Sequence, residues 1–360
     1  MGLSDQIDRY KKRAGIVLAK RRLQGRSPEP PPAPFVCGVT RSGTTLLQVL
    51  IDAHPRLAIP PESHIYDRFG PFLDIYGDLT VRRCRNRFIG ALLDDSFIRQ
   101  WRLEATVADI ERRVQRPDRV GVIDALFSLY AERKGAVRWG DKTPEHIRHL
   151  QEIRADFPHA KLIHLVRDGR DVAEAMRRMV FGPVSAVGLA GEWQREVSHW
   201  NEFCDAHGSA DTLLLHYEDL VTSPRESVDE VLRFIGEPEL DTVSGYASSS
   251  LSRELATTQR AWHSSLAKGI TANKIGTYRQ AFSSREIELF EAIAGERLAT
   301  YGYTPDNATP TAATVVERAY AFFADRFVRW ARKLLHPSVV RLELQFRLRV
   351  MQRRLFSTAR

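Results

Sequence analysis

The chain has 360 residues, of which 43% are hydrophobic and 27% charged, close to the averages of globular proteins. This composition excludes collagen, a long coiled coil and wholesale disorder, and three widely spaced cysteines exclude a disulfide scaffold and a thiolate zinc site. The net charge of +8 is concentrated at the ends, because residues 1–34 carry +5, residues 325–360 carry +8 and the stretch between them carries −5. Basic ends suit an anionic surface such as a membrane or nucleic acid.

Proline-rich and polar segments divide the chain into three parts. Residues 1–34 are expected to form a short basic amphipathic helix and a proline-rich linker. Residues 35–304 are expected to form one α/β domain, and residues 305–360 a linker and a basic amphipathic helical tail. The chain begins without the apolar core of a secretory signal, and it has no apolar run of about 18 residues. We therefore expect a cytoplasmic protein, and the basic ends leave open peripheral attachment to the inner face of a membrane.

Short apolar segments alternate with helical patterns in the central part. The candidate strands are Phe35–Val39, Leu57–Ile59, Val137–Trp139, Leu162–Val166 and Leu213–Leu215. The helices expected after most of them are Thr44–Ala53, Glu145–Asp156, Asp168–Arg178 and Ser223–Ile235. This alternation predicts an α/β, P-loop-like three-layer fold with a central parallel sheet of about five strands, helical insertions and ligands at the carboxyl ends of the strands.

Two further segments have patterns that predict helices. Residues 64–135 are expected to form a helical insertion, which with residues 182–188 borders the acceptor side of a site. Trp193, Val197, Trp200 and Cys204 recur at helical spacing, which predicts a buried core helix rather than a ligand platform.

A glycine-rich loop, Gly38-Val-Thr-Arg-Ser-Gly-Thr-Thr45, follows the first strand. Backbone N–H groups in such a loop, together with the helix N-terminus behind them, form a site for an anion such as phosphate. Nucleotide hydrolases have a lysine where this chain has Thr44, so a P-loop kinase is the weaker alternative. A turn with a simple helix cap is the structural alternative. The candidate phosphate ligands are Arg41, Ser42, Gly43, Thr44 and Thr45.

Further motifs accompany the loop in a fixed order. They are Arg41–Leu47, Asp52–Pro55, Leu165–Val172, Tyr217–Leu220, Ile275–Arg279 and Tyr301–Tyr303. Together they resemble the sulfotransferase superfamily, and most closely its tyrosylprotein-sulfotransferase-like and related bacterial members. The resemblance implies transfer of a sulfuryl group from 3′-phosphoadenosine 5′-phosphosulfate (PAPS) to a hydroxyl or amine, with no metal. A catalytically degenerate nucleotide-binding or scaffold protein remains the alternative of another class.

The resemblance also implies catalytic roles for three residues. Arg41 and Lys142 are expected to stabilise charge on the transferring group, and Glu62 is expected to take the acceptor's proton. Local sequence alone also allows a solvated Lys142 paired with Asp141, and a Glu62 that only begins a helix. His64 and, more weakly, His54 are rival bases, since cytosolic members of the family use a histidine.

The 3′-phosphate of the donor is expected to bind Arg167, with further contacts from Tyr217 and Lys274. Asp168 and Asp171 fit a helix cap, and Arg170 either binds phosphate or lies on the outer face of the helix. The family usually has a serine eight residues after the arginine that corresponds to Arg167, whereas this chain has Ala175.

The basic tail carries the last set of expectations. Its apolar pattern begins at Val316 and continues with arginines interleaved, in residues 315–335 and 339–356. A basic amphipathic helix is typical of a membrane-surface element, and packing on the domain or in a homodimer is the alternative. No motif indicates specific nucleic-acid binding. The sulfuryl acceptor stays open among glycans, lipids, small metabolites and proteins.

Overall fold

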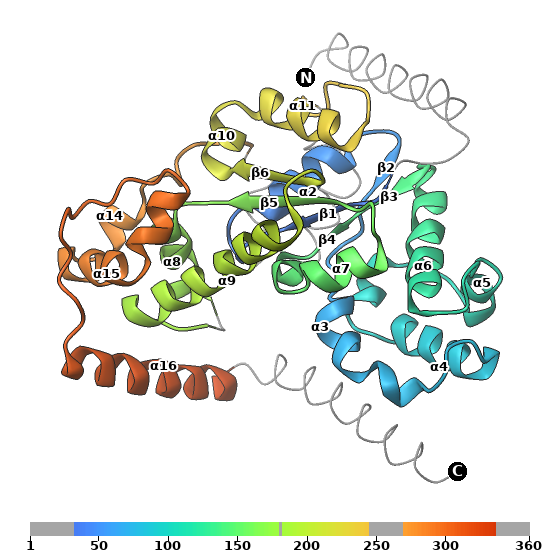
Figure 1. Cartoon of the computed structure of the whole chain (residues 1–360), viewed down its shortest axis with the longest axis horizontal. Coiled ribbons are helices and arrows are strands. Elements are labelled where there is room, and N and C mark those ends of the chain that lie inside the picture. The colour runs from blue at the N-terminus through green and yellow to red at the C-terminus, as the bar shows by residue number, and fades with distance from the viewer. Residues whose placement is uncertain (1–31, 180–181, 245–268, 336–360) are drawn as a thin grey trace, which may run out of the picture.

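The computed structural model describes residues 32–179, 182–244 and 269–335, and its arrangement is shown in Figure 1. The expected helix at the N-terminus, most of the proline-rich linker and the segment 339–356 of the tail lie outside these residues. The described part is an α/β structure with helices on both faces of a central parallel sheet, as the sequence predicts.

The central sheet has four parallel strands in the order β4-β1-β5-β6. These strands are β4 (Asp141–Lys142), β1 (Pro34–Cys37), β5 (Lys161–Val166) and β6 (Thr212–His216). Successive side chains of a strand point to opposite faces of a sheet. In β1, Val36 therefore joins the apolar cluster on one face, while Phe35 and Cys37 join the cluster on the other. Both faces are covered, which explains why β1 and β5 are apolar almost throughout.

The expectation of about five strands in one sheet needs a correction at Gly140. The predicted strand Val137–Trp139 is β3 (Arg138–Trp139), which pairs with β2 (Leu57–Ala58) in a separate two-stranded sheet. The chain crosses to the main sheet at Gly140, whose N–H donates to the carbonyl of Ala58 at 3.1 Å, and β4 then pairs with β1. A Cβ at position 140 would lie 2.9 Å from Pro34, so this crossing requires glycine.

Helices form the two outer layers. One face is covered by α2 (Thr44–Asp52) and α11 (Pro224–Ile235), with α10 (Tyr217–Thr222) after β6. The other face is covered by α7 (Leu150–Asp156), α8 (Gly169–Arg177) and α9 (Ala186–His207), and α15 (Ser284–Thr300) packs against α8 and α9, as Figure 1 shows. Trp193, Val197 and Trp200 are buried and Cys204 packs against the core, so the predicted core helix is confirmed.

The expected helical insertion lies between β2 and β3. It contains α3 (Ile65–Phe69), η1 (Gly70–Tyr76), α4 (Arg82–Leu93), η2 (Ile98–Trp101), α5 (Val107–Glu111) and α6 (Arg119–Lys134). The expected helix Glu145–Asp156 is interrupted: a 3₁₀ segment, η3 (Pro144–Arg148), precedes α7. His149 between them leaves the helical conformation, and its Nε2 lies 3.0 Å from Asp67 of α3.

The C-terminal part continues through α14 (Tyr278–Ala281), α15 and α16 (Val315–Leu335). Among the residues that the structure describes, no helix combines the length and the apolar character needed to cross a bilayer.

Candidate active site

The loop after β1 has the backbone shape that the glycine-rich motif predicts. Gly43 adopts a positive φ of 96° at the start of α2, and a Cβ there would lie 2.5 Å from the ring of Tyr217. Arg41 also has a positive φ, 78°, which is uncommon for a residue with a side chain. The hydroxyl of Ser42 is buried and has no hydrogen-bond partner among the described residues. The first N–H groups of α2 have no partners within the helix, so this loop provides donors for an anion.

Three predicted side chains meet beside this loop. The ammonium of Lys142 contacts the carboxylate of Glu62 and lies 3.1 Å from the hydroxyl of Thr45, at the first turn of α2. Lys142 is only 1% exposed and pairs with Glu62 rather than Asp141. The alternative of a solvated surface lysine is therefore wrong.

The strand register explains how Lys142 reaches this position. Lys142 pairs with Val36 at the carboxyl half of β1, one strand away from the loop. The neighbouring Asp141 is buried and accepts hydrogen bonds from Ser63 at 2.6 Å and from His146 at 2.8 Å. The Thr143 hydroxyl also accepts from the N–H of Ser63. These bonds hold the backbone next to Glu62, a positioning role that the sequence analysis missed because it depends on pairing across 78 residues.

The electrostatics of Glu62 favour the carboxylate. Burial by itself raises its pKa, but the charge of Lys142 and the hydrogen bond from His64 outweigh burial and hold the pKa well below its usual range. Glu62 is therefore ionised at neutral pH. Because one carboxylate oxygen contacts Lys142 and the other lies 3.3 Å from His64, Glu62 is oriented by a cation on each side.

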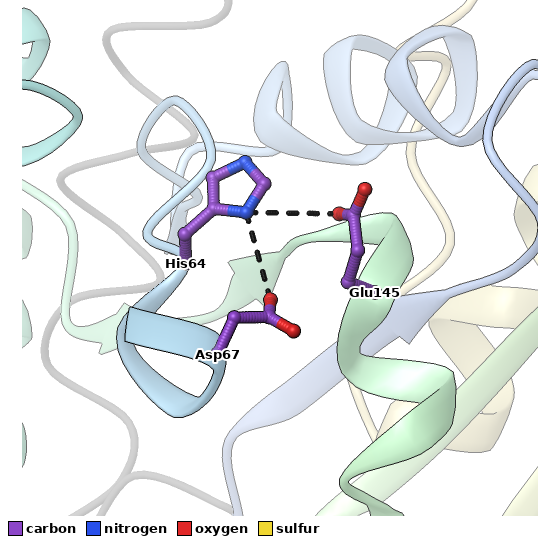
Figure 2. Close-up of side chains that lie close together, drawn as sticks. All are labelled: His64, Asp67 and Glu145. Atoms are coloured by element: carbon purple, nitrogen blue, oxygen red, sulfur yellow. Dashed lines mark ion pairs between the residues drawn. The ribbon is translucent and has the colours of Figure 1, made fainter. Parts of the chain in front are cut away.

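His64, the rival base, is held as a cation. Figure 2 shows its Nδ1 between Asp67 and Glu145, at 3.6 and 3.7 Å. Burial lowers the pKa of His64, but the neighbouring carboxylates of Asp67, Glu62 and Glu145 raise it to about 10. A protonated imidazole cannot accept a proton. The other rival, His54, instead lies beside the carbonyl of Pro238 at 3.2 Å.

His64, Asp67 and Glu145 also offer one ligand atom each within 4.8 Å of one another, a set that could hold a cation. An imidazolium between two carboxylates accounts for the same geometry, because each carboxylate then faces a positive charge. We therefore describe the three residues as an ion-pair cluster next to Glu62.

This ion-pair cluster predicts a pH dependence of stability. The pKa of His64 is about 10 in the folded protein and about 6.5 in an unfolded chain, so its contribution is complete below about pH 6.5 and is lost as the pH rises to about 10. We expect His64→Gln to lower the thermal midpoint most near pH 6, and to have little effect near pH 10. Thermal denaturation across this range measures the difference. The exposed His207→Gln serves as control, and a constant difference at all pH values would contradict the assignment.

The predicted 3′-phosphate residues lie on the other side of the loop. The guanidinium of Arg167, after β5, stacks on the ring of Tyr217 at 4.5 Å and donates to the backbone carbonyls of Arg41 and Lys274, at 3.2 and 2.6 Å. The Lys274 side chain itself is exposed. Burial and the charges of Arg167 and Arg178 lower the pKa of Arg41, as expected where like charges gather around an anion site.

The helix after Arg167 corrects two expectations. Arg170 is buried and pairs with Asp168 at 2.8 Å and with Glu291 at 2.6 Å, so it lies neither on the outer face nor free for phosphate. Asp168 does cap the helix, since it accepts from the N–H of Arg170. Asp171 is not a cap: it accepts from the N–H groups of Gly276 and Tyr278. It thereby ties the segment that carries Lys274 to the start of α8, while Ala175 is half-buried further along the helix.

The architecture around this site is that of solved sulfotransferase domains. The sulfotransferase domain of the Synechococcus PCC 7002 olefin synthase superposes with a TM-score of 0.53 at 23% identity, covering 77% of this chain and 97% of that one. The sulfotransferase domain of the curacin biosynthetic pathway gives 0.52 at 17% identity, covering 76% and 99%.

The sequence comparison adds the family. The sulfotransferase family model matches residues 32–241, more than half of the chain, and the chain belongs to this family. It is 27% identical to protein-tyrosine sulfotransferase 1 of Danio rerio over 229 residues, which is 59% of this chain and 55% of the relative. It is 26% identical to nodulation protein NoeE of Sinorhizobium fredii over 234 residues, 57% of this chain and 51% of that protein. The chain thus spans about half the length of these curated relatives.

Proposed function

We propose that the protein transfers a sulfuryl group from PAPS to a hydroxyl or amine of an acceptor. The observation that carries this proposal is the contact of Lys142 with both Glu62 and Thr45, at the end of the glycine-rich loop. It joins a cation for the transferring group, a carboxylate for the acceptor's proton and an anion-binding helix N-terminus within one set of contacts. Membership in the sulfotransferase family supports the same chemistry.

The two sides of the loop suit the two parts of the donor. The N–H groups at the start of α2 and the side chain of Arg41 are suited to the 5′-phosphosulfate. Arg167 is suited to the 3′-phosphate, because a guanidinium can bind phosphate through two parallel N–H bonds. Arg167 now donates to two backbone carbonyls, and these are weaker partners than a charged phosphate.

The chemical step is an in-line displacement. The new bond joins the acceptor oxygen or nitrogen to sulfur, and the bond between sulfur and the phosphate oxygen breaks with its electron pair left on the phosphate. Glu62 takes the acceptor's proton. Lys142 stabilises the negative charge that develops on the transferring group.

The contact between Lys142 and Glu62 couples these roles. While Lys142 faces Glu62, it lowers the pKa of that carboxylate and makes it a weak base. A sulfuryl group next to Lys142 offers the ammonium a second anionic partner. The pKa of Glu62 then rises, so the base is strengthened when the donor is present.

We also propose a cytoplasmic site of action. All three cysteines, Cys37, Cys84 and Cys204, are free, which suits a reducing compartment. We propose no narrower acceptor class than a compound that carries a hydroxyl or an amine.

The proposal predicts which nucleotide stabilises the protein. Adenosine 3′,5′-bisphosphate at about 100 times its dissociation constant adds about 2.7 kcal/mol, or roughly 5–10 °C in thermal midpoint for a chain of this size. We expect adenosine 5′-phosphate, which lacks the 3′-phosphate, and ATP to give much smaller shifts. Arg167→Ala should abolish the preference for the bisphosphate, while the surface variant Arg133→Ala should keep it. A shift with ATP and none with the bisphosphate would instead favour a P-loop kinase.

A further inference from the structure

The orientation of α16 is unusual for a helix packed on a domain, because the side that faces the protein carries a buried carboxylate and none of the helix's large aromatic side chains. Asp325 is buried, and its carboxylate accepts hydrogen bonds from the N–H groups of Val184 and Ser185 at 2.7 and 2.9 Å and from the Ser185 hydroxyl at 2.7 Å. Ala321, one turn earlier, is buried on the same side. These contacts attach α16 to the start of α9, at the edge of the molecule in Figure 1.

The opposite side of α16 is apolar and exposed. Five large side chains recur there at intervals of four and three residues, which places them on one stripe of the helix. Their exposed fractions run from 77% at the first to 59% at the last. We refer to this stripe as the aromatic face, and it consists of Val316, Tyr320, Phe323, Phe327 and Trp330.

Cations line one edge between the attached side and the aromatic face. At about 100° per residue, Arg318, Arg326 and Arg329 project within a sector of about 80°, in which the exposed Phe322 also lies. Arg318, Arg326 and Arg329 are exposed. The charge continues beyond the described residues, since residues 336–360 carry six arginines and one glutamate.

We propose that the aromatic face of α16 binds the surface of a lipid bilayer that contains anionic lipids. The helix then lies in the plane of the interface, with the aromatic face in the acyl boundary and the basic edge against the headgroups. Charge argues against the other occupants. A second copy of α16 would bring two basic edges together, and residues 336–360 are themselves strongly basic.

A partition experiment with the full chain tests the apolar contribution. Sedimentation with vesicles of phosphatidylcholine, alone or mixed with phosphatidylglycerol, measures binding. We expect binding only to the mixed vesicles. The double variant Phe323→Ser/Phe327→Ser should bind at least about tenfold more weakly. Val81→Ser removes another apolar side chain that is 49% exposed, away from α16, and should leave binding unchanged.

A second pair of variants tests the charge. Removing two cations near an anionic surface should weaken binding by about 30-fold. We expect this loss in Arg318→Gln/Arg326→Gln and not in the matched double variant Arg99→Gln/Arg133→Gln, whose arginines are exposed elsewhere. Binding of the wild type should also fall as salt is raised.

Three kinds of result would overturn the proposal. The first is a vesicle result: no binding by the wild type, equal binding to both kinds of vesicle, or unchanged binding by the Phe323→Ser/Phe327→Ser variant. The second is a dimer in analytical ultracentrifugation that this variant dissociates while the wild type ignores vesicles, which would make the aromatic face a contact between copies. The third is a fall in the thermal midpoint of the Phe323→Ser/Phe327→Ser variant that exceeds the fall caused by Val81→Ser. That result would mean that the protein's own chain covers the aromatic face. None of these measurements involves nucleotide, so they are independent of the proposed reaction.

Discussion

Replacing Glu62 with glutamine is expected to lower turnover by about 10²- to 10⁴-fold, the usual contribution of a general base. Glutamine keeps the shape and the oxygen that faces Lys142, but it cannot take a proton. Affinity for adenosine 3′,5′-bisphosphate should change little, because Glu62 lies on the Lys142 side of the loop, opposite Arg167. Transfer of the radiolabelled sulfuryl group of PAPS, to water as sulfate or to a phenol as an aryl sulfate, measures turnover, and calorimetric titration measures affinity.

Two further variants make this result specific. Glu152→Gln changes an exposed glutamate of α7 in the same way and should retain full turnover. Glu62→Asp shortens the side chain but keeps the carboxylate, so it should recover part of the lost rate. If Glu62→Gln turns over at the wild-type rate, the base is another group, and a neutral His64 is then the first candidate.

Lys142→Met is expected to lower kcat by about 10²- to 10³-fold, the cost of losing one donor that stabilises developing charge. The effect should fall on kcat more than on donor affinity, because the charge on the transferring group grows in the transition state. Lys161→Met is the control: it removes a lysine that pairs with Asp211 at the opposite end of the sheet. A loss of donor affinity with kcat unchanged would instead make Lys142 a simple donor ligand.

The Lys142→Met variant should also shift the low-pH limb of the plot of kcat/KM against pH. Glu62 must be deprotonated to act, so kcat/KM falls as the pH drops through its pKa. The charge of Lys142 holds that pKa low in the wild type, while burial acts in the opposite direction. With Lys142 removed, burial dominates, the pKa of Glu62 rises, and the limb moves to higher pH. If the low-pH limb of the variant does not shift, Lys142 does not control the pKa of Glu62.

The local motifs made the fold and the loop predictable from sequence. An apolar strand, a glycine-rich turn and a helix start are encoded within a dozen residues, so Arg41–Thr45 could be recognised without distant contacts. Strand ends are also local, and the carboxyl ends of parallel strands share one edge of a sheet. That geometry predicts Arg167 at the site, whereas Lys142 reaches it on β4, beyond the crossing at Gly140. The buried face of α9 followed from helical periodicity in the same way.

The pairing partners of charged groups were decided only by the tertiary structure. The residues next to Arg170 in the sequence are compatible either with a phosphate ligand or with a solvent-exposed side chain. In the structure, Arg170 is buried and forms an ion pair with Glu291, which lies over a hundred residues away in the chain. Other features likewise depend on chain segments that are far apart in sequence. They are the crossing between the two sheets at Gly140, the hydrogen bond from Gly276 to Asp171 and the cationic state of His64. The fold class, the anion loop and the residues at the strand ends follow from local sequence, because backbone preference and hydrophobic period act over a few residues. The pairing of the charges, the proton state that each group holds and the side of α16 that is exposed depend on the folded arrangement, because desolvation and Coulomb energy depend on what packs nearby.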